Sequence, residues 1–155
     1  MTLAWSYSSF HSAGAVATGP REITTVQHCA SPEWEYLTFD DYMRGLPPGH
    51  AVRVQCTPVR PFEGYDDGWC TYSTDRYIEH WSPRVSRDCQ DERVSSVHHA
   101  TGSAFAPALG YSYDSPARGW LRVSMPLGPG ASGAPVWCGE DLIGVYALTR
   151  FVVTW

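Results

Sequence analysis

The chain has 155 residues, the size of one domain or of two tightly packed halves, and its 43% hydrophobic and 17% charged content is typical of a globular protein. The net charge is −5, all 11 basic residues are Arg, and none of them forms a basic run, which excludes nucleic-acid binding driven by phosphate contacts. No segment approaches the roughly 18 apolar residues of a membrane span, and the N-terminus lacks the features of a signal peptide, so secretion is not evident.

Short segments of alternating apolar residues in the first half predict β-strands. These segments are residues 12–18, 22–26, 35–39, 51–56 and 69–72. Glycine and proline at 19–20, 45–49 and 60–61 separate the segments and would interrupt a regular helix. Together with 14% aromatic residues, 14 Gly and 12 Pro, this pattern predicts an all-β fold of short strands and many turns.

The most polar stretch of the chain, residues 82–96, predicts a surface connection between two halves of similar composition. Beyond it, four more segments predict strands, at residues 120–124, 136–138, 142–148 and 151–155. Strands at intervals of about ten residues are typical of a β-sandwich or of a pair of barrels.

The cysteines are odd in number, and no two of them form a Cys-x-x-C pair. They are Cys29, Cys56, Cys70, Cys89 and Cys138. An odd number cannot form a complete disulfide framework, and the spacing is not that of a zinc ribbon. We therefore expect reduced, mostly buried thiols, a reducing compartment and no metal site.

A glycine-rich turn at residues 126–138, with the sequence PLGPGASGAPVWC, delivers Ser132 directly before an apolar strand. Glycine tolerates the backbone angles that turn N–H groups toward a carbonyl oxygen as it becomes negative. We therefore predict Ser132 as a nucleophile, with the N–H groups of Gly130 and Ser132 as its oxyanion hole. Taken alone, the segment could also be a simple hairpin turn.

A serine hydroxyl needs a base, and the order of residues restricts which histidine supplies it. No His follows Ser132, which excludes the order of α/β-hydrolases, and the chain is too short for a subtilisin fold, so the order His, acid, Ser remains. His28 ends an apolar strand at a corner of small residues, which can hold an imidazole rigidly, and we predict it as the base. His11 and His50 are expected in loops, and the pair at 98–99 has no acidic cluster at metal-ligand spacing.

Several aspartates between His28 and Ser132 compete for the third catalytic role. The acid must lie buried at the start of a strand, where it accepts the imidazole N–H. Asp67 directly precedes an apolar run and is the favoured candidate. The alternatives are Asp66, Asp75, Asp40 and Asp41.

Two segments resemble the chymotrypsin-like serine proteases. Residues 23–29, Ile-Thr-Thr-Val-Gln-His-Cys, resemble the Val-x-Thr-Ala-Ala-His-Cys signature around the family's catalytic His. Residues 129–135, Pro-Gly-Ala-Ser-Gly-Ala-Pro, resemble the family's Gly-Asp-Ser-Gly-Gly-Pro. The resemblance implies two packed antiparallel barrels of the six-stranded type with the active site in the cleft between them. Residues 1–81 would carry the His and Asp, 82–93 would connect, and 94–155 would carry the Ser.

The resemblance also implies a function, that of a serine endopeptidase which hydrolyses peptide bonds through an acyl-enzyme. Such an enzyme needs no cofactor, and its partner is a polypeptide. Residues 125–129 and 146–149 would wall the pocket for the side chain that precedes the cut, with Leu127, Ala147 and Leu148 as contacts. These walls contain no acid, so we expect an apolar or aromatic residue there rather than Arg or Lys.

Some residues depart from the pattern of the cellular proteases. Ala131 replaces the Asp that pairs with a liberated N-terminus in digestive members, so we expect no zymogen activation of that kind. This loosened Gly-x-Ser-Gly pattern looks like that of compact viral proteases. The closing residues 149–155 are similar to the closing strand of alphavirus capsid proteases. The likeness implies processing of a viral polyprotein in the host cytoplasm, including the chain's own precursor. Trp155 is then either an ordinary strand residue, which is the favoured interpretation, or a self-cleavage terminus that stays in the cleft. The alternative is a catalytically inactive, protease-like binding module.

Overall fold

The computed structural model describes residues 1–155 except 9–10, 41–43, 100–104, 126 and 129. The first six strands are β1 (Thr2–Ser8), β2 (His11–Gly19), β3 (Glu22–Val26), β4 (Glu33–Asp40), β5 (Arg44–Pro58) and β6 (Gly68–Thr74), with a short 3-10 turn η1 (Gln27–Cys29) after β3. The other six are β7 (Arg93–His99), β8 (Phe105–Tyr111), β9 (Trp120–Arg122), β10 (Pro135–Cys138), β11 (Asp141–Leu148) and β12 (Phe151–Thr154). Within the described ranges, no helix has the length and apolar character to cross a bilayer.

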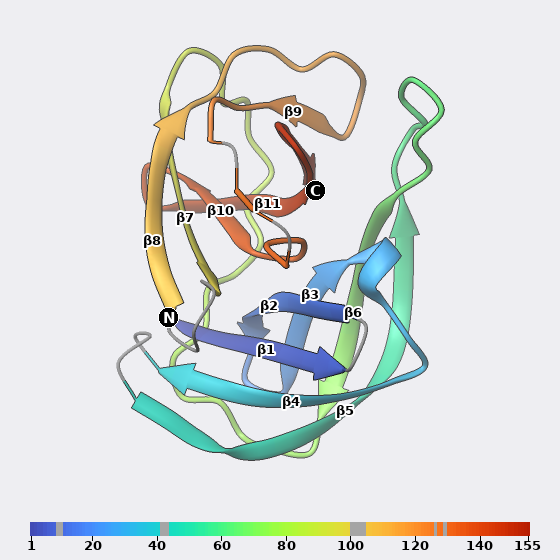
Figure 1. The fold of residues 1–155 in the computed structure, drawn as a ribbon, viewed down its shortest axis with the longest axis vertical. Coiled ribbons are helices and arrows are strands. Elements are labelled where there is room, and N and C mark those ends of the chain that lie inside the picture. Colours follow the sequence, from blue (N-terminus) through green and yellow to red (C-terminus); the bar gives the residue numbers. More distant parts are fainter. Residues whose placement is uncertain (9–10, 41–43, 100–104, 126, 129) are drawn as a thin grey trace.

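The first six strands form a closed antiparallel barrel in the order β1-β2-β3-β6-β5-β4. The other six form an antiparallel sheet in the order β8-β7-β10-β11-β12-β9. The two edges of this second sheet meet just beyond β8, where Ser112 bridges Val123 and Tyr113 N–H donates to the Arg122 carbonyl at 2.8 Å. Figure 1 shows the barrel, coloured blue to green, beside the second sheet, coloured yellow to red. The predicted fold, all-β with two packed six-stranded units, is confirmed.

The strands β1 and β8 were not expected from the sequence, and of β7 only the pair at 98–99 was expected on a strand. The start of β7 falls within the polar stretch predicted as a connection. Ser96 of β7 is buried, and its hydroxyl donates to the Pro135 carbonyl at 2.6 Å. This hydrogen bond allows a polar side chain to be buried there. The expected break at 45–49 is also wrong, since β5 runs through both prolines and an irregularity in its pairing with β4 accommodates them. His50 consequently lies within β5 rather than in a loop.

Shared hydrophobic clusters join the two sheets. Ile23 and Tyr72 from the barrel belong to one cluster with Val145 and Val153 from the second sheet. A side-chain contact reinforces the junction: Phe62, in the β5–β6 connection, packs against the ring of Trp120 at a centroid distance of 6.1 Å. Because these side chains are packed on both sides, the barrel and the sheet hold a fixed relative position along this junction.

Four of the five cysteines form disulfides, so the expectation of reduced thiols is wrong for them. Cys56 pairs with Cys70 between neighbouring positions of β5 and β6, and Cys89 pairs with Cys138 between the connection and β10. Cys29 is a buried thiol outside both disulfides. The odd count excluded only complete pairing, whereas the register of the sheet decided which sulfurs meet. Disulfides are typical of proteins that fold in oxidising compartments.

Candidate active site

His28 lies where the edge of the barrel turns. Strand β3 ends at Val26, opposite Trp69 of β6, and the chain then enters η1, which Ala30 N–H closes by donating to the Gln27 carbonyl at 2.9 Å. This turn leaves the imidazole half-buried, with 38% of its side chain exposed. The end of an apolar strand therefore presents a histidine at the surface, as its position in the sequence suggested.

Asp67 lies immediately before β6 and faces this histidine. One carboxylate oxygen, Oδ1, accepts from the backbone N–H of His28 at 3.1 Å and from that of Gly68 at 2.9 Å. The other oxygen, Oδ2, lies 2.7 Å from His28 Nδ1, and only 3% of the Asp67 side chain is exposed. An ionised carboxylate only accepts hydrogen bonds, so Nδ1 carries the proton and the lone pair of a neutral imidazole resides on Nε2.

The same contacts set the proton affinity of the imidazole. The hydrogen bond to the Asp67 carboxylate, and after it the one to Cys29, raise the pKa of His28 from 6.5 to about 10, although burial alone would lower it. Interaction with an anionic partner favours the charged imidazolium. The pair therefore stabilises the protonated form that a histidine base becomes when it withdraws a proton.

The segment that carries Ser132 packs directly on the barrel. Gly14 N–H in β2 donates to the Ser132 carbonyl at 2.8 Å, and Gly133 N–H donates to the Tyr146 carbonyl of β11 at 2.8 Å. A Cβ added at Gly133, where φ is +87°, would lie 2.0 Å from the Gly14 carbonyl oxygen and 2.6 Å from Thr25 Oγ1. Only glycine allows so close an approach. Gly133, the residue after Ser132, therefore lies close to Thr25 of the barrel. Thr25 precedes His28 by three residues.

The Ser132 side chain itself points to its own half of the molecule. Its hydroxyl donates to the Ala147 carbonyl at 3.0 Å and makes no hydrogen bond to His28. A rotation about the Ser132 Cα–Cβ bond would release the hydroxyl from Ala147. For a half-buried side chain of this size, such rotations are fast.

The backbone N–H groups of Gly130 and Ser132 make no hydrogen bond to the described residues. Gly130 has φ +89°, in the left-handed region, and its loop is closed by Ala131 N–H, which donates to the Gly128 carbonyl at 3.3 Å. Within the described part of the chain, neither Gly130 N–H nor Ser132 N–H donates to any protein atom. These are the two groups that the sequence predicted as an oxyanion hole, and both are left for an external acceptor.

The residues predicted as pocket walls include one that bonds Ser132 and two that bond each other. Leu127 packs at the edge of the second sheet's core, and its N–H donates to the hydroxyl of Tyr146 at 3.3 Å. Ala147 is buried beside Ser132, and Leu148 is half-buried against the shared cluster. Tyr146 belongs to the predicted wall at 146–149, although it was not singled out there as a substrate contact. The structure adds that its hydroxyl accepts from Leu127 of the other predicted wall.

The two other candidate acids that the structure describes in full, Asp66 and Asp75, make no hydrogen bond to His28. Asp66 is exposed, and Asp75 accepts from the backbone N–H of His50 at 3.1 Å. The side chain of Asp40 and the whole of Asp41 lie outside the described residues. Of the acids that the structure describes in full, Asp67 is the one in contact with the imidazole.

One cluster of potential metal ligands occurs in the described ranges, but its sulfurs are occupied. It consists of Cys89, Glu92 and Cys138, and the two cysteines form a disulfide with each other. A disulfide sulfur is not the thiolate that metals such as zinc require. The carboxylate of Glu92 is the one possible ligand left in this cluster, and it does not by itself indicate a metal site.

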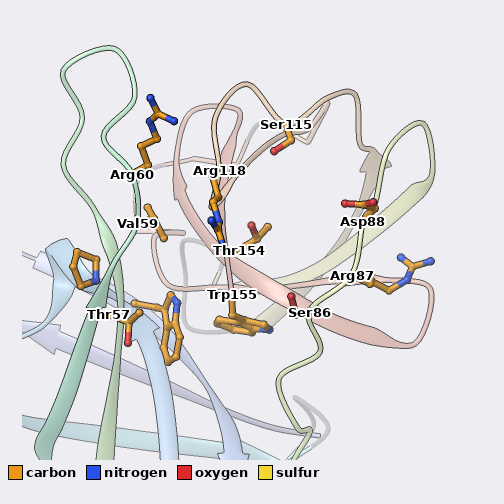
Figure 2. A pocket seen from close by; sticks show the side chains of 13 residues that line it. Thr57, Val59, Arg60, Ser86, Arg87, Asp88, Ser115, Arg118, Thr154 and Trp155 are labelled. Atoms are coloured by element: carbon orange, nitrogen blue, oxygen red, sulfur yellow. The ribbon is translucent and has the colours of Figure 1, made fainter.

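A separate cavity of about 830 Å³ lies between the β5–β6 connection and the second sheet (Figure 2). Val59 and Arg60 line one side of it, and Arg118 and Trp155 line the other. The Trp155 indole N–H donates to the Leu142 carbonyl at 2.8 Å. Trp155 therefore lines this cavity, and its role as a self-cleavage terminus stays a prediction.

Known proteins share the fold but not the sequence. No family model and no curated protein matches the chain. Among solved structures, it is similar to a Glu endopeptidase with a TM-score of 0.73 at 13% identity, covering 98% of this chain and 83% of that one. It is also similar to the scabies mite inactivated protease paralogue S-D1 (TM-score 0.74, 12% identity, 99% and 86% covered) and to the MamO protease domain from Magnetospirillum magneticum (0.67, 14%, 99% and 90%).

Likeness at such low identity establishes the fold and leaves the activity open. One of these three proteins is named as inactivated, so the same fold serves with and without catalysis. Activity must therefore be argued from the site. The chain has the fold of the chymotrypsin-like serine proteases.

Proposed function

We propose that this protein is a serine endopeptidase in which Ser132 is the nucleophile, His28 the base and Asp67 the residue that orients the base. The observation that carries the proposal is the 2.7 Å contact between His28 Nδ1 and a buried carboxylate oxygen of Asp67, at a strand end against which the Ser132 segment packs. Buried charge of this kind is rarely kept for stability alone, since desolvation offsets much of its attraction.

The reaction follows from these positions. His28 Nε2 takes the proton of Ser132 as Oγ bonds to the carbonyl carbon of a peptide, and the carbonyl oxygen becomes negative between the N–H groups of Gly130 and Ser132. The C–N bond then breaks, and the imidazolium gives its proton to the departing amine. A water, deprotonated by His28, attacks the acyl-enzyme, which releases the acid product and restores the Ser132 hydroxyl.

A second candidate function is a binding module that holds peptide without cleaving it. The observation in its favour is the hydrogen bond from Ser132 Oγ to the Ala147 carbonyl, which occupies the hydroxyl away from His28. This candidate uses the same N–H groups of Gly130 and Ser132. The two functions differ only in whether His28 activates Ser132.

A fluorophosphonate probe distinguishes them. Its phosphorus bonds to an activated serine oxygen while fluoride leaves, and an unactivated serine reacts slowly. We expect the wild type to be labelled at Ser132, labelling to be lost in Ser132→Ala, and labelling to fall by about 10³-fold or more in His28→Ala. His50→Ala, a histidine elsewhere in the barrel, is the matched control and should retain labelling. An unlabelled, folded wild type would favour the binding module.

A narrower form of the proposal concerns the substrate. We propose that the chain processes a viral polyprotein, its own precursor included, on the ground of the resemblance at residues 129–135 and 149–155. None of the three solved structures named above is described as viral. Mass spectrometry of a precursor extended at both ends tests this form, since release of fragments must require Ser132. An intact precursor would refute self-processing without affecting cleavage of other polypeptides.

A further inference from the structure

The proposed mechanism determines where the side chain of the residue before the cut must lie. The inference below rests on that mechanism. The attacked carbonyl carbon must lie against Ser132 Oγ, with its oxygen near the N–H groups of Gly130 and Ser132. The side chain of that residue branches one bond away from the carbonyl carbon. We place it between the two predicted pocket walls, the segment at Leu127 and the strand end at 147–149, since Ser132 contacts the second wall through the Ala147 carbonyl.

Tyr146 spans this gap. Its backbone is paired with the nucleophile segment through two hydrogen bonds of 2.8 Å, from Gly133 N–H to the Tyr146 carbonyl and from Tyr146 N–H to the Ala134 carbonyl. Its hydroxyl accepts from Leu127 N–H on one wall and donates to the Thr149 carbonyl on the other. The tip of the Tyr146 ring therefore lies between the two walls.

The Tyr146 ring is packed firmly in this position. Tyr146 is 2% exposed and belongs to the core cluster of the second sheet, beside Met125 and Val152. Burial raises the pKa of its hydroxyl, so the group is neutral and keeps its proton for the Thr149 carbonyl. Moving the ring away would break the hydrogen bonds of its hydroxyl to Leu127 N–H and to the Thr149 carbonyl and would expose a core side chain.

We infer that Tyr146 fills the specificity pocket of this protein and restricts the residue before the cut to one with a small side chain, Gly, Ala or Ser. The tyrosine occupies the volume that a large substrate side chain would need, and packed interiors do not yield that volume without displacing side chains. This narrows the expectation from the sequence, where an acid-free pocket suggested any apolar or aromatic residue. It also excludes a cut after Trp155 by this pocket.

Peptidyl phosphonates test the inference on the wild-type protein. Four probes with the same peptide carry Gly, Ala, Val or Phe at the position next to phosphorus, and the rate of Ser132 labelling is measured for each. We expect the Ala probe to react at least about 100-fold faster than the Phe probe, with Val between them. Equal rates for Ala and Phe, or a preference for Phe, would overturn the inference and leave the proposed endopeptidase intact. Failure of a fluorophosphonate to label Ser132 would instead remove the proposed function and the inference with it.

Substitutions assign the preference to the tyrosine. Tyr146→Ala should open the gap and lower the ratio of Ala to Phe labelling rates by at least about tenfold. Tyr146→Phe keeps the ring and removes only the hydroxyl, so the ratio should stay within about threefold of the wild type. Tyr77→Ala, which truncates a 67% exposed tyrosine, controls for general effects. An unchanged ratio in a folded Tyr146→Ala protein would overturn the assignment. Because the wild-type series needs no variant, the inference stays falsifiable even if Tyr146→Ala does not fold.

Discussion

Asp67 holds His28 by two separate contacts, since Oδ2 lies 2.7 Å from the imidazole Nδ1 while Oδ1 accepts the backbone N–H of the same residue at 3.1 Å. One carboxylate thus fixes both the backbone and the ring of the proposed base. The distance between these residues in sequence is 39 positions, and the pairing of β3 with β6 brings them together. The predictions below test what this arrangement does and what supports it.

Replacement of Asp67 by Asn should nearly abolish activity. An amide can donate as well as accept, so His28 loses the partner that keeps the proton on Nδ1, and labelling by a fluorophosphonate should fall by about 10³ to 10⁴-fold. The matched control is Asp66→Asn, which makes the same change at the exposed neighbour and should stay within about twofold of the wild type. Equal losses in the two variants would show that Asp67 has no special role.

The pH dependence of labelling should report the raised pKa of His28. A protonated imidazole cannot withdraw the Ser132 proton, so the rate should rise with pH through a midpoint well above 6.5, toward about 10. In Asp67→Asn the midpoint of the residual rate should move down toward 6.5, because the anionic partner is gone. A wild-type midpoint at or below 6.5 would contradict the arrangement at the imidazole.

The raised pKa of His28 also makes the free energy of unfolding depend on pH. This contribution falls as the pH rises, whereas the labelling rate rises. Because the folded-state pKa of His28 is raised above its unfolded value of 6.5, its contribution to the free energy of unfolding is fully present below pH 6.5 and is lost as the pH rises toward about 10. The stability difference between wild type and His28→Ala, measured by urea denaturation, should therefore shrink from pH 6 to pH 10. A difference that grows over this range would show the pKa to be lowered instead.

Gly133→Ala should prevent the nucleophile segment from docking on the barrel. The added Cβ meets the Gly14 carbonyl and Thr25 Oγ1, in addition to the strain of φ +87°. Gly64→Ala places the same methyl group at φ +81° with no atom within 4 Å, so it measures the strain alone, about 1 to 2 kcal/mol. We expect Gly133→Ala to cost about 1 to 3 kcal/mol more than that, by urea denaturation, and to abolish labelling of Ser132. Equal costs for the two variants would show that Gly133 is not tightly docked.

The two disulfides should be found by peptide mapping under non-reducing conditions, as Cys56–Cys70 and Cys89–Cys138. Closing the shorter loop, of sequence separation 14, stabilises the fold by about 3 kcal/mol, and closing the longer one, of separation 49, by about 4 kcal/mol. Reduction should therefore lower the melting temperature, and Cys29→Ser should not change either pairing. Any disulfide that includes Cys29 would contradict the structure.

The sequence by itself determined the strand-rich class, most strand positions and the identity of Ser132 and His28 as candidates. It could do so because alternation, turn residues and the glycines around Ser132 are local features, visible within a few neighbouring positions. It also favoured Asp67 over Asp66, since alternation along a strand separates adjacent side chains onto opposite faces.

Only the tertiary structure decided which distant groups meet. The sulfurs of Cys56 and Cys70 pair because the register of β5 against β6 makes them neighbours, and no cysteine count contains that register. The resemblance placed Tyr146 and Leu127 in the walls of one pocket, but only the tertiary structure shows that the Tyr146 hydroxyl bonds both Leu127 N–H and the Thr149 carbonyl. Long-range packing, not local propensity, therefore determines both the cross-links and the shape of the proposed specificity pocket.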